Sequence, residues 1–157
     1  QVVPMPPGKI ERRVRTRMIR QEVLTARNPP LELSVVIDEA VLLRKVGSGK
    51  VMAGQLRHLT EMGRLPNVDL RILPLGGEAS LMADSFVVFG FSPEHETSKL
   101  GDVVMTEGIE SSFYVEGETD TYNFRRFFQA VVEASKSPGD SGALLLEIAE
   151  RHWKQLR

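Results

Sequence analysis

The chain has 157 residues, 41% of them hydrophobic and 26% charged, a composition that favours one soluble globular domain over residues 1–157. Its net charge of −1 creates no overall electrostatic field that would attract nucleic acid or a membrane surface. The lack of cysteine excludes disulfides and thiolate metal sites. No apolar run approaches the roughly 20 residues that span a bilayer, so we expect a cytoplasmic protein without a membrane partner.

The first predicted elements are a Pro-rich lead-in and a basic helix. Residues 1–8 are expected to be extended, and residues 9–27 have the apolar spacing of a helix that ends at Asn28-Pro29-Pro30. The helix carries basic residues that we expect to be spread around it, not gathered in one stripe: Lys9, Arg12, Arg13, Arg15, Arg17, Arg20 and Arg27. Two interpretations are open: a solvated helix whose arginines pair with acids of the domain, or a surface for nucleic acid or an acidic partner.

A β-α-β unit is predicted between Leu31 and Pro74. Residues 31–37 are nearly all apolar, which predicts a strand buried on both faces. Gly47-Ser48-Gly49 predicts a turn, and residues 50–64 have the pattern of an amphipathic helix. Residues 68–73 alternate with a period of two, which predicts a strand. This order normally produces a parallel pair of strands with a right-handed crossover.

The second half of the chain predicts three further strands and two helices. Residues 85–91, 102–106 and 112–115 have strand patterns, and the close spacing of the last two favours antiparallel pairing. Residues 121–135 form an amphipathic helix, and Ser137-Pro138-Gly139-Asp140 has the cap, Pro and acid that open another helix. We therefore predict an α/β (α+β) fold: a mixed sheet of about five strands, with the N-terminal helix and two C-terminal helices packed on it.

Two strings that resemble catalytic motifs are better explained as local structure. Gly47-Ser48-Gly49-Lys50 lacks the first glycine and the last hydroxyl of a nucleotide-binding loop, because Arg44 and Val51 occupy those positions. Gly139-Asp140-Ser141-Gly142 matches the string around the nucleophile of chymotrypsin-like proteases, but it falls at a predicted helix start. No histidine is spaced for a metal, so we predict no catalytic residues, no metal and no cofactor.

Five polar residues are candidates for a ligand-binding site or a structural cluster: Arg17, Arg20, Gln21, Glu39 and Glu107. The first three lie close together on the N-terminal helix, and the two glutamates each follow a predicted strand, where open α/β sheets bind ligands. Either these residues line a polar pocket, or they form buried ion pairs that fix helix to sheet.

Several motifs follow one another in an order and spacing that resemble a known family. They are an R-x-x-R-Q helix, a D-E-A strand end, a Q-L-x-x-L helix and a P-N-V strand start. The matching residues are Arg17, Arg20, Gln21, Asp38, Glu39, Gln55, Leu56, Leu59, Pro66, Asn67, Val68 and Pro74. The chain resembles the C-terminal domain of helix-turn-helix regulators of the XRE type, which are abundant in sporulating filamentous bacteria. The resemblance implies that an N-terminal DNA-binding module, which we expect to be missing from a chain that begins with Gln1, precedes this domain.

The resemblance and the residues together predict a non-catalytic regulatory domain of a DNA-binding transcriptional regulator. We expect a homodimer formed through a helical face, contact with DNA only through the missing module, and a small-molecule ligand or small protein partner as the signal. Two alternatives stay open. One is a small hydrolase- or transferase-like enzyme that uses Glu39 and Glu107, and the other is a module that binds a small cognate protein through an exposed apolar patch.

Overall fold

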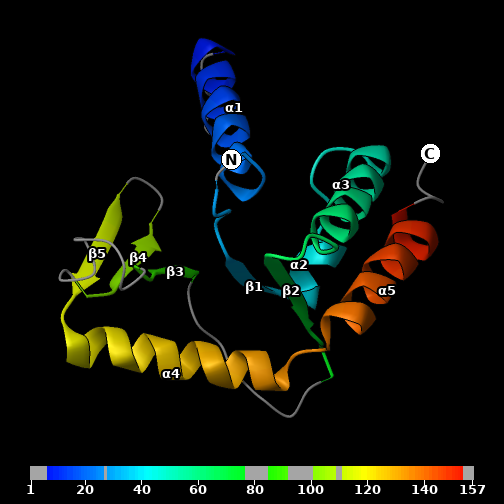
Figure 1. The fold of residues 1–157 in the computed structure, drawn as a ribbon. Coiled ribbons are helices and arrows are strands. Elements are labelled where there is room, and N and C mark those ends of the chain that lie inside the picture. The colour runs from blue at the N-terminus through cyan, green and yellow to red at the C-terminus, as the bar shows by residue number, and fades with distance from the viewer. Residues whose placement is uncertain (1–6, 27, 77–84, 92–100, 109–110, 154–157) are drawn as a thin grey trace.

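The computed structural model describes residues 7–26, 28–76, 85–91, 101–108 and 111–153 (Figure 1). The strands are β1 (Leu33–Asp38), β2 (Val68–Leu73), β3 (Phe86–Phe89), β4 (Val103–Glu107) and β5 (Ser112–Glu116). The helices are α1 (Pro7–Gln21), α2 (Glu39–Leu43), α3 (Gly49–Met62), α4 (Glu118–Ala134) and α5 (Pro138–Ile148), with a 3-10 turn at Glu22–Leu24 and a π-helical turn at Ala149–Trp153. The predicted α+β class and the five strands are confirmed, but these strands form two sheets where we expected one.

The first sheet is the predicted β-α-β unit. β1 and β2 pair in parallel, and their connection contains α3 and the short helix α2, which we did not predict. Asp38 begins α2 by accepting a hydrogen bond from the Ala40 N–H at 2.7 Å. Ser48 begins α3 by accepting one from the Val51 N–H at 3.2 Å, so the Gly-Ser-Gly-Lys segment is a helix entry, as expected.

The buried core lies between this sheet, α3 and α5, which cover the same face of the sheet (Figure 1). Trp153 is 2% exposed, and its indole N–H donates to the Leu42 carbonyl at 2.9 Å. In α5 and the turn that follows it, Leu145, Ile148, Ala149 and Trp153 are all buried. The prediction that the first strand is buried on both faces is wrong: every residue of β1 is half-buried or exposed, because helices cover one face of this sheet.

The first turn of α5 and the segment before it close the free edge of β2. The Ile72 N–H donates to the Ser141 hydroxyl at 2.9 Å, and the Lys136 N–H donates to the Ile72 carbonyl at 2.9 Å. Ser137 caps α5 by accepting a hydrogen bond from the Asp140 N–H, with Pro138 as the first helical residue. The serine of the protease-like string is therefore a buried structural residue.

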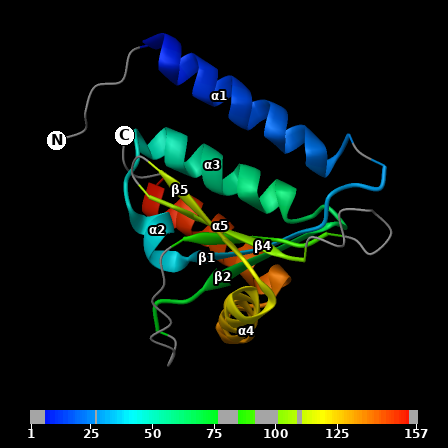
Figure 2. The same cartoon turned by 90° about the vertical axis from the view of Figure 1, so that its left-hand side faces the viewer.

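The second sheet is antiparallel, in the order β3-β4-β5. α4 lies along one of its faces (Figure 2), where the Phe86 ring contacts the rings of Phe124 and Phe127 at centroid distances of 5.2 and 6.0 Å. The Arg125 guanidinium pairs with the Asp102 carboxylate and joins α4 to the start of β4. This hydrogen bond raises the pKa of Arg125 above its usual value.

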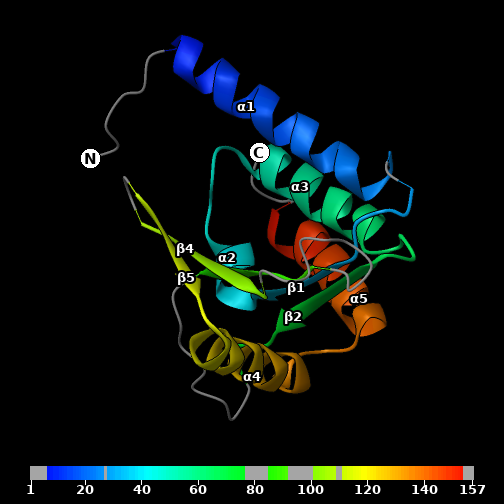
Figure 3. The same cartoon turned by 60° about the vertical axis from the view of Figure 1, so that its left-hand side comes forward.

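The N-terminal helix does not pack on a sheet, so that part of the prediction is wrong. α1 lies at the outer edge of the molecule in all three views (Figures 1–3), and every residue from Gly8 to Gln21 is exposed. Six of its fifteen side chains are basic, and burying them would remove charge from water. Pro7 and Gly8, expected in an extended lead-in, belong to α1, while residues 1–6 lie outside the described part. Among the described residues, no helix is both long and apolar enough to cross a membrane.

Candidate functional site

A hollow of about 490 Å³ lies between α1 and the turn that joins β4 to β5. The α1 wall consists of Arg12, Arg13, Thr16, Arg17 and Arg20. The opposite wall consists of Glu107, Gly108, Ser111 and Ser112, and the Gly108 N–H donates to the Ser111 carbonyl at 2.8 Å. The structure therefore places three of the five predicted site residues, Arg17, Arg20 and Glu107, on one cavity, which we call the arginine hollow.

The basic residues of α1 are less evenly spread than we expected. At 3.6 residues per turn, the five α1 residues of the arginine hollow fall within an arc of about 140°. α1 contains six basic residues and one acid, a net charge of +5, so in a chain of net charge −1 the other residues carry −6. The charge of this protein is therefore polarised between α1 and the rest of the chain.

The other two predicted site residues lie elsewhere. Gln21 is exposed at the end of α1 and does not line the arginine hollow. Glu39 is in the first turn of α2, where its Oε2 accepts a hydrogen bond from the Leu75 N–H at 2.9 Å. It thus fastens the segment after β2 to the start of α2. Glu39 and Glu107 do not share the hollow, so the geometry gives no support to an enzyme that uses both carboxylates.

Ion pairs do not explain the predicted cluster either. Within the described residues, the pairs are Asp69–Arg71, Asp102–Arg125 and Glu147–Arg151, and none includes a candidate site residue. The same part of the chain holds no group of three residues of metal-binding type that could share an ion. His95, one of the histidines weighed as a ligand, lies outside the described residues.

One face of α1 is an apolar stripe open to solvent. Ile10, Val14 and Met18 recur every four residues and are 48%, 54% and 57% exposed. The centre of this stripe lies about 130° around the helix from the centre of the arginine arc. α1 therefore directs its charge toward the arginine hollow and its apolar residues elsewhere.

The face of the antiparallel sheet opposite α4 is also apolar, and we call it the open sheet face. The residues of this face follow from strand alternation, because Val87 pairs with Met105 and Met105 pairs with Tyr114. Its residues are Val87, Phe89, Val103, Met105, Glu107, Ser112, Tyr114 and Glu116. Val87 is 44% exposed, Phe89 41% and Tyr114 63%, whereas Val104 on the α4 side is fully buried.

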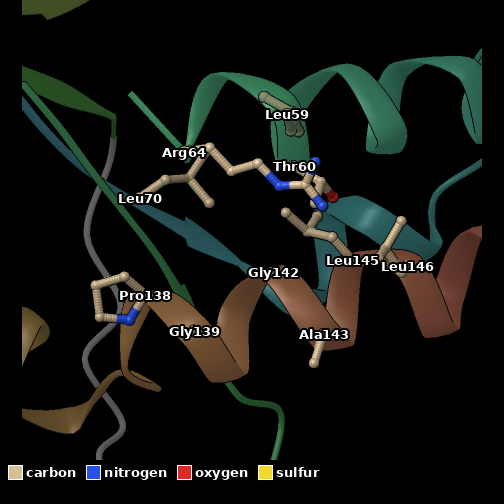
Figure 4. A pocket seen from close by; sticks show the side chains of 11 residues that line it. Leu59, Thr60, Arg64, Leu70, Pro138, Gly139, Gly142, Ala143, Leu145 and Leu146 are labelled. Carbon is tan, nitrogen blue, oxygen red and sulfur yellow. The ribbon is translucent and has the colours of Figure 1, made fainter. Parts of the chain in front are cut away.

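A second, smaller hollow of about 280 Å³ lies between α3 and α5 (Figure 4). Its walls are mainly apolar, and a Cβ added at Gly142 would make an ordinary contact with the Thr60 methyl at 3.9 Å. The Thr60 hydroxyl donates to the Leu56 carbonyl at 3.0 Å within its own helix. This hollow is a groove at the margin of the core, and Figure 4 shows the Arg64 side chain extending to Thr60 within its lining.

Sequence reasoning missed the role of Asn67, which we had assigned to the P-N-V strand start. Its side-chain amide donates to the Leu24 carbonyl at 2.9 Å and to the Leu31 carbonyl at 2.8 Å. Asn67 therefore ties the segment after α1 to the start of β2. The P-N-V motif singled this residue out, but its partners are 36 and 43 residues away and no local pattern reveals them.

The family model described as Domain of unknown function (DUF5753) matches residues 3–147. The chain belongs to this family. No curated protein and no solved structure matches the chain. Because the DUF5753 match runs from before α1 almost to the end of α5, the arginine hollow, the apolar stripe and the open sheet face all lie within the family domain.

Proposed function

We propose that this DUF5753 chain is the non-catalytic regulatory domain of an XRE-type helix-turn-helix transcriptional regulator and that it acts as a homodimer. The ordered motifs from Arg17 to Pro74 support the regulator association. The observation that carries the dimer is the apolar stripe of α1, which is exposed on a helix that stands apart from the core. A dimer places two DNA-binding modules around a twofold axis, as paired half-sites require.

Burial across the described residues supports self-association. Seventeen large hydrophobic residues are exposed, compared with twelve hydrophobic residues in the buried core. An isolated helix of fifteen residues is marginal in water, so α1 gains stability from a surface that covers its stripe. The +5 charge of α1 and the −6 charge of the remaining residues favour contact between α1 of one copy and the body of another.

The open sheet face of the second copy is the surface that fits α1. From Ile10 to Met18 the stripe spans about 12 Å, and strands of four or five residues are about 13 to 17 Å long. The face is apolar at its centre, and Glu116 lies at the end away from the arginine hollow, where it can meet an arginine that flanks the stripe. In the proposed dimer, each α1 packs on the open sheet face of the other copy, which makes the interface isologous.

A pair of matched substitutions tests this proposal. Val14→Glu places a charge in the apolar stripe, whereas Ile19→Glu makes the same change on another side of α1 at nearly equal exposure, 56% compared with 54%. We expect the Val14 variant to dissociate to the 17.5 kDa monomer in sedimentation experiments and the Ile19 variant to stay dimeric. Dissociation of both, or of neither, would show that the stripe is not the interface.

The exposed faces also favour a second candidate function, the binding of a small cognate protein. Apolar patches of this kind mark protein interfaces whether or not the partner is a second copy. A wild-type chain that is monomeric at micromolar concentration would favour this candidate over the homodimer.

A further inference from the structure

We infer that the arginine hollow binds a small molecule that carries phosphate at one end and hydroxyl or amino hydrogen-bond donors at the other. This inference gives the proposed regulatory domain a signal, but it does not depend on dimerisation. It rests on the two unlike walls of the hollow, one on α1 and one on the β4–β5 turn.

The α1 wall is built for phosphate. Four arginines line the hollow, Arg12, Arg13, Arg17 and Arg20, and they lie along about 12 Å of helix. None of them belongs to an ion pair among the described residues, and like charges three or four residues apart destabilise a helix. An anion bound between them removes this repulsion, and the planar guanidinium fork matches phosphate oxygens with two parallel hydrogen bonds.

The opposite wall determines which end of the ligand faces the turn. The Glu107 carboxylate accepts hydrogen bonds and repels a second anion, while the hydroxyls of Ser111 and Ser112 both donate and accept. A molecule with phosphate at both ends therefore fits poorly. A sugar or nucleoside phosphate fits, because its hydroxyl or amino groups reach Glu107 when its phosphate lies against α1.

The size and position of the hollow favour a small ligand over nucleic acid. About 490 Å³ is within the range of small-molecule sites, roughly 300 to 1,000 Å³. A nucleic acid would extend beyond the hollow onto a body that carries −6, and electrostatic repulsion opposes that. The apolar stripe lies on another side of α1, and the wall residues Glu107 and Ser112 lie at the end of the open sheet face opposite Glu116.

Calorimetric titration with adenosine 5′-diphosphate as the probe tests the inference. Pyrophosphate tests the phosphate end alone, adenosine tests the donor end alone, and a short DNA duplex tests nucleic acid. We expect saturable binding of the nucleotide, weaker binding of pyrophosphate and none of adenosine. Thermal unfolding under the same conditions should show the nucleotide raising the melting temperature, since it binds the folded chain.

Three variants locate the binding. Arg17→Gln should weaken nucleotide binding about tenfold, the effect of one lost charge-assisted contact. Arg15→Gln removes the same charge from the same helix but lies outside the hollow, so it should change affinity less than twofold. Glu107→Gln should weaken binding of the nucleotide and not of pyrophosphate, a difference that a purely structural role would not produce.

Several results would overturn the inference. One is the absence of saturable binding by nucleotide and pyrophosphate at millimolar concentration. Another is equal loss of affinity in the Arg15 and Arg17 variants, which would show diffuse attraction to α1. Tighter binding of the duplex, weakened by Arg17→Gln, would make the hollow a nucleic-acid surface. The oligomeric mass of each variant, measured in parallel, separates failure of this inference from failure of the dimer proposal.

Discussion

The region built on the parallel sheet and the region built on the antiparallel sheet bury their apolar residues to different extents. In the part of the chain that the structure describes, eleven of the twelve buried hydrophobic residues belong to the cluster around β1, β2, α3 and α5, and the twelfth is Val104 of the antiparallel sheet. We call these the parallel region and, together with α1 and α4, the open region. The difference teaches that one set of helices completes the first core, whereas the second sheet has α4 on one face and exposed apolar residues on the other.

The comparison predicts that the largest loss of stability comes from the parallel region. Trp153→Ala removes the largest fully buried side chain and its hydrogen bond to Leu42, so we expect the free energy of unfolding to fall by about 3 to 5 kcal/mol. Chemical denaturation followed by circular dichroism measures this free energy of unfolding. The matched substitution Tyr114→Ala, on the open sheet face, should cost the isolated chain less than about 1 kcal/mol. Equal losses would break the distinction between the regions.

A smaller effect is expected where the edge of β2 meets α5. Ser141→Ala leaves the buried Ile72 N–H without its hydrogen-bond acceptor, so unfolding should become about 1 to 3 kcal/mol easier. Ser34→Ala, on the exposed side of β1, is the control and should lie within about 0.5 kcal/mol of wild type. A neutral Ser141 variant would mean that this edge is not closed by the serine hydroxyl.

The smallest effect is expected at the ion pair of the open region. Asp102→Ala removes the carboxylate that pairs with Arg125, but the arginine side chain is 55% exposed, so solvent screening limits the loss to about 1 kcal/mol or less. Hydrogen exchange should show the reduced protection in β3, β4 and α4, with the parallel region unchanged. Lost protection throughout the chain would show that the two regions unfold as one unit.

Much of the fold could be predicted because its signals are local. The turn at Gly47-Ser48-Gly49, the helix cap at Ser137 and the alternation of β2 depend on residues a few positions apart, and each was found where the sequence placed it. The burial of β1 was not predictable, since an apolar strand looks the same whether one or two faces are covered. The division of five strands into two sheets depends on pairing between distant segments, which periodicity does not encode.

The candidate site could be predicted in part for the same reason. Arg17 and Arg20 share one side of a helix, which spacing reveals, and Glu107 follows a strand that spacing also reveals. That Glu107 lies opposite the arginines while Glu39 binds the Leu75 N–H is a consequence of tertiary structure. The ligand of the arginine hollow therefore stays a prediction, although three of its residues were named from sequence.

The most direct test of the central claim, that a second copy completes the open region, is the mass of the wild-type chain in solution. Analytical ultracentrifugation over a range of micromolar concentrations should give twice the 17.5 kDa mass of the chain, falling toward one chain on dilution. A mass of 17.5 kDa at every concentration would contradict the account.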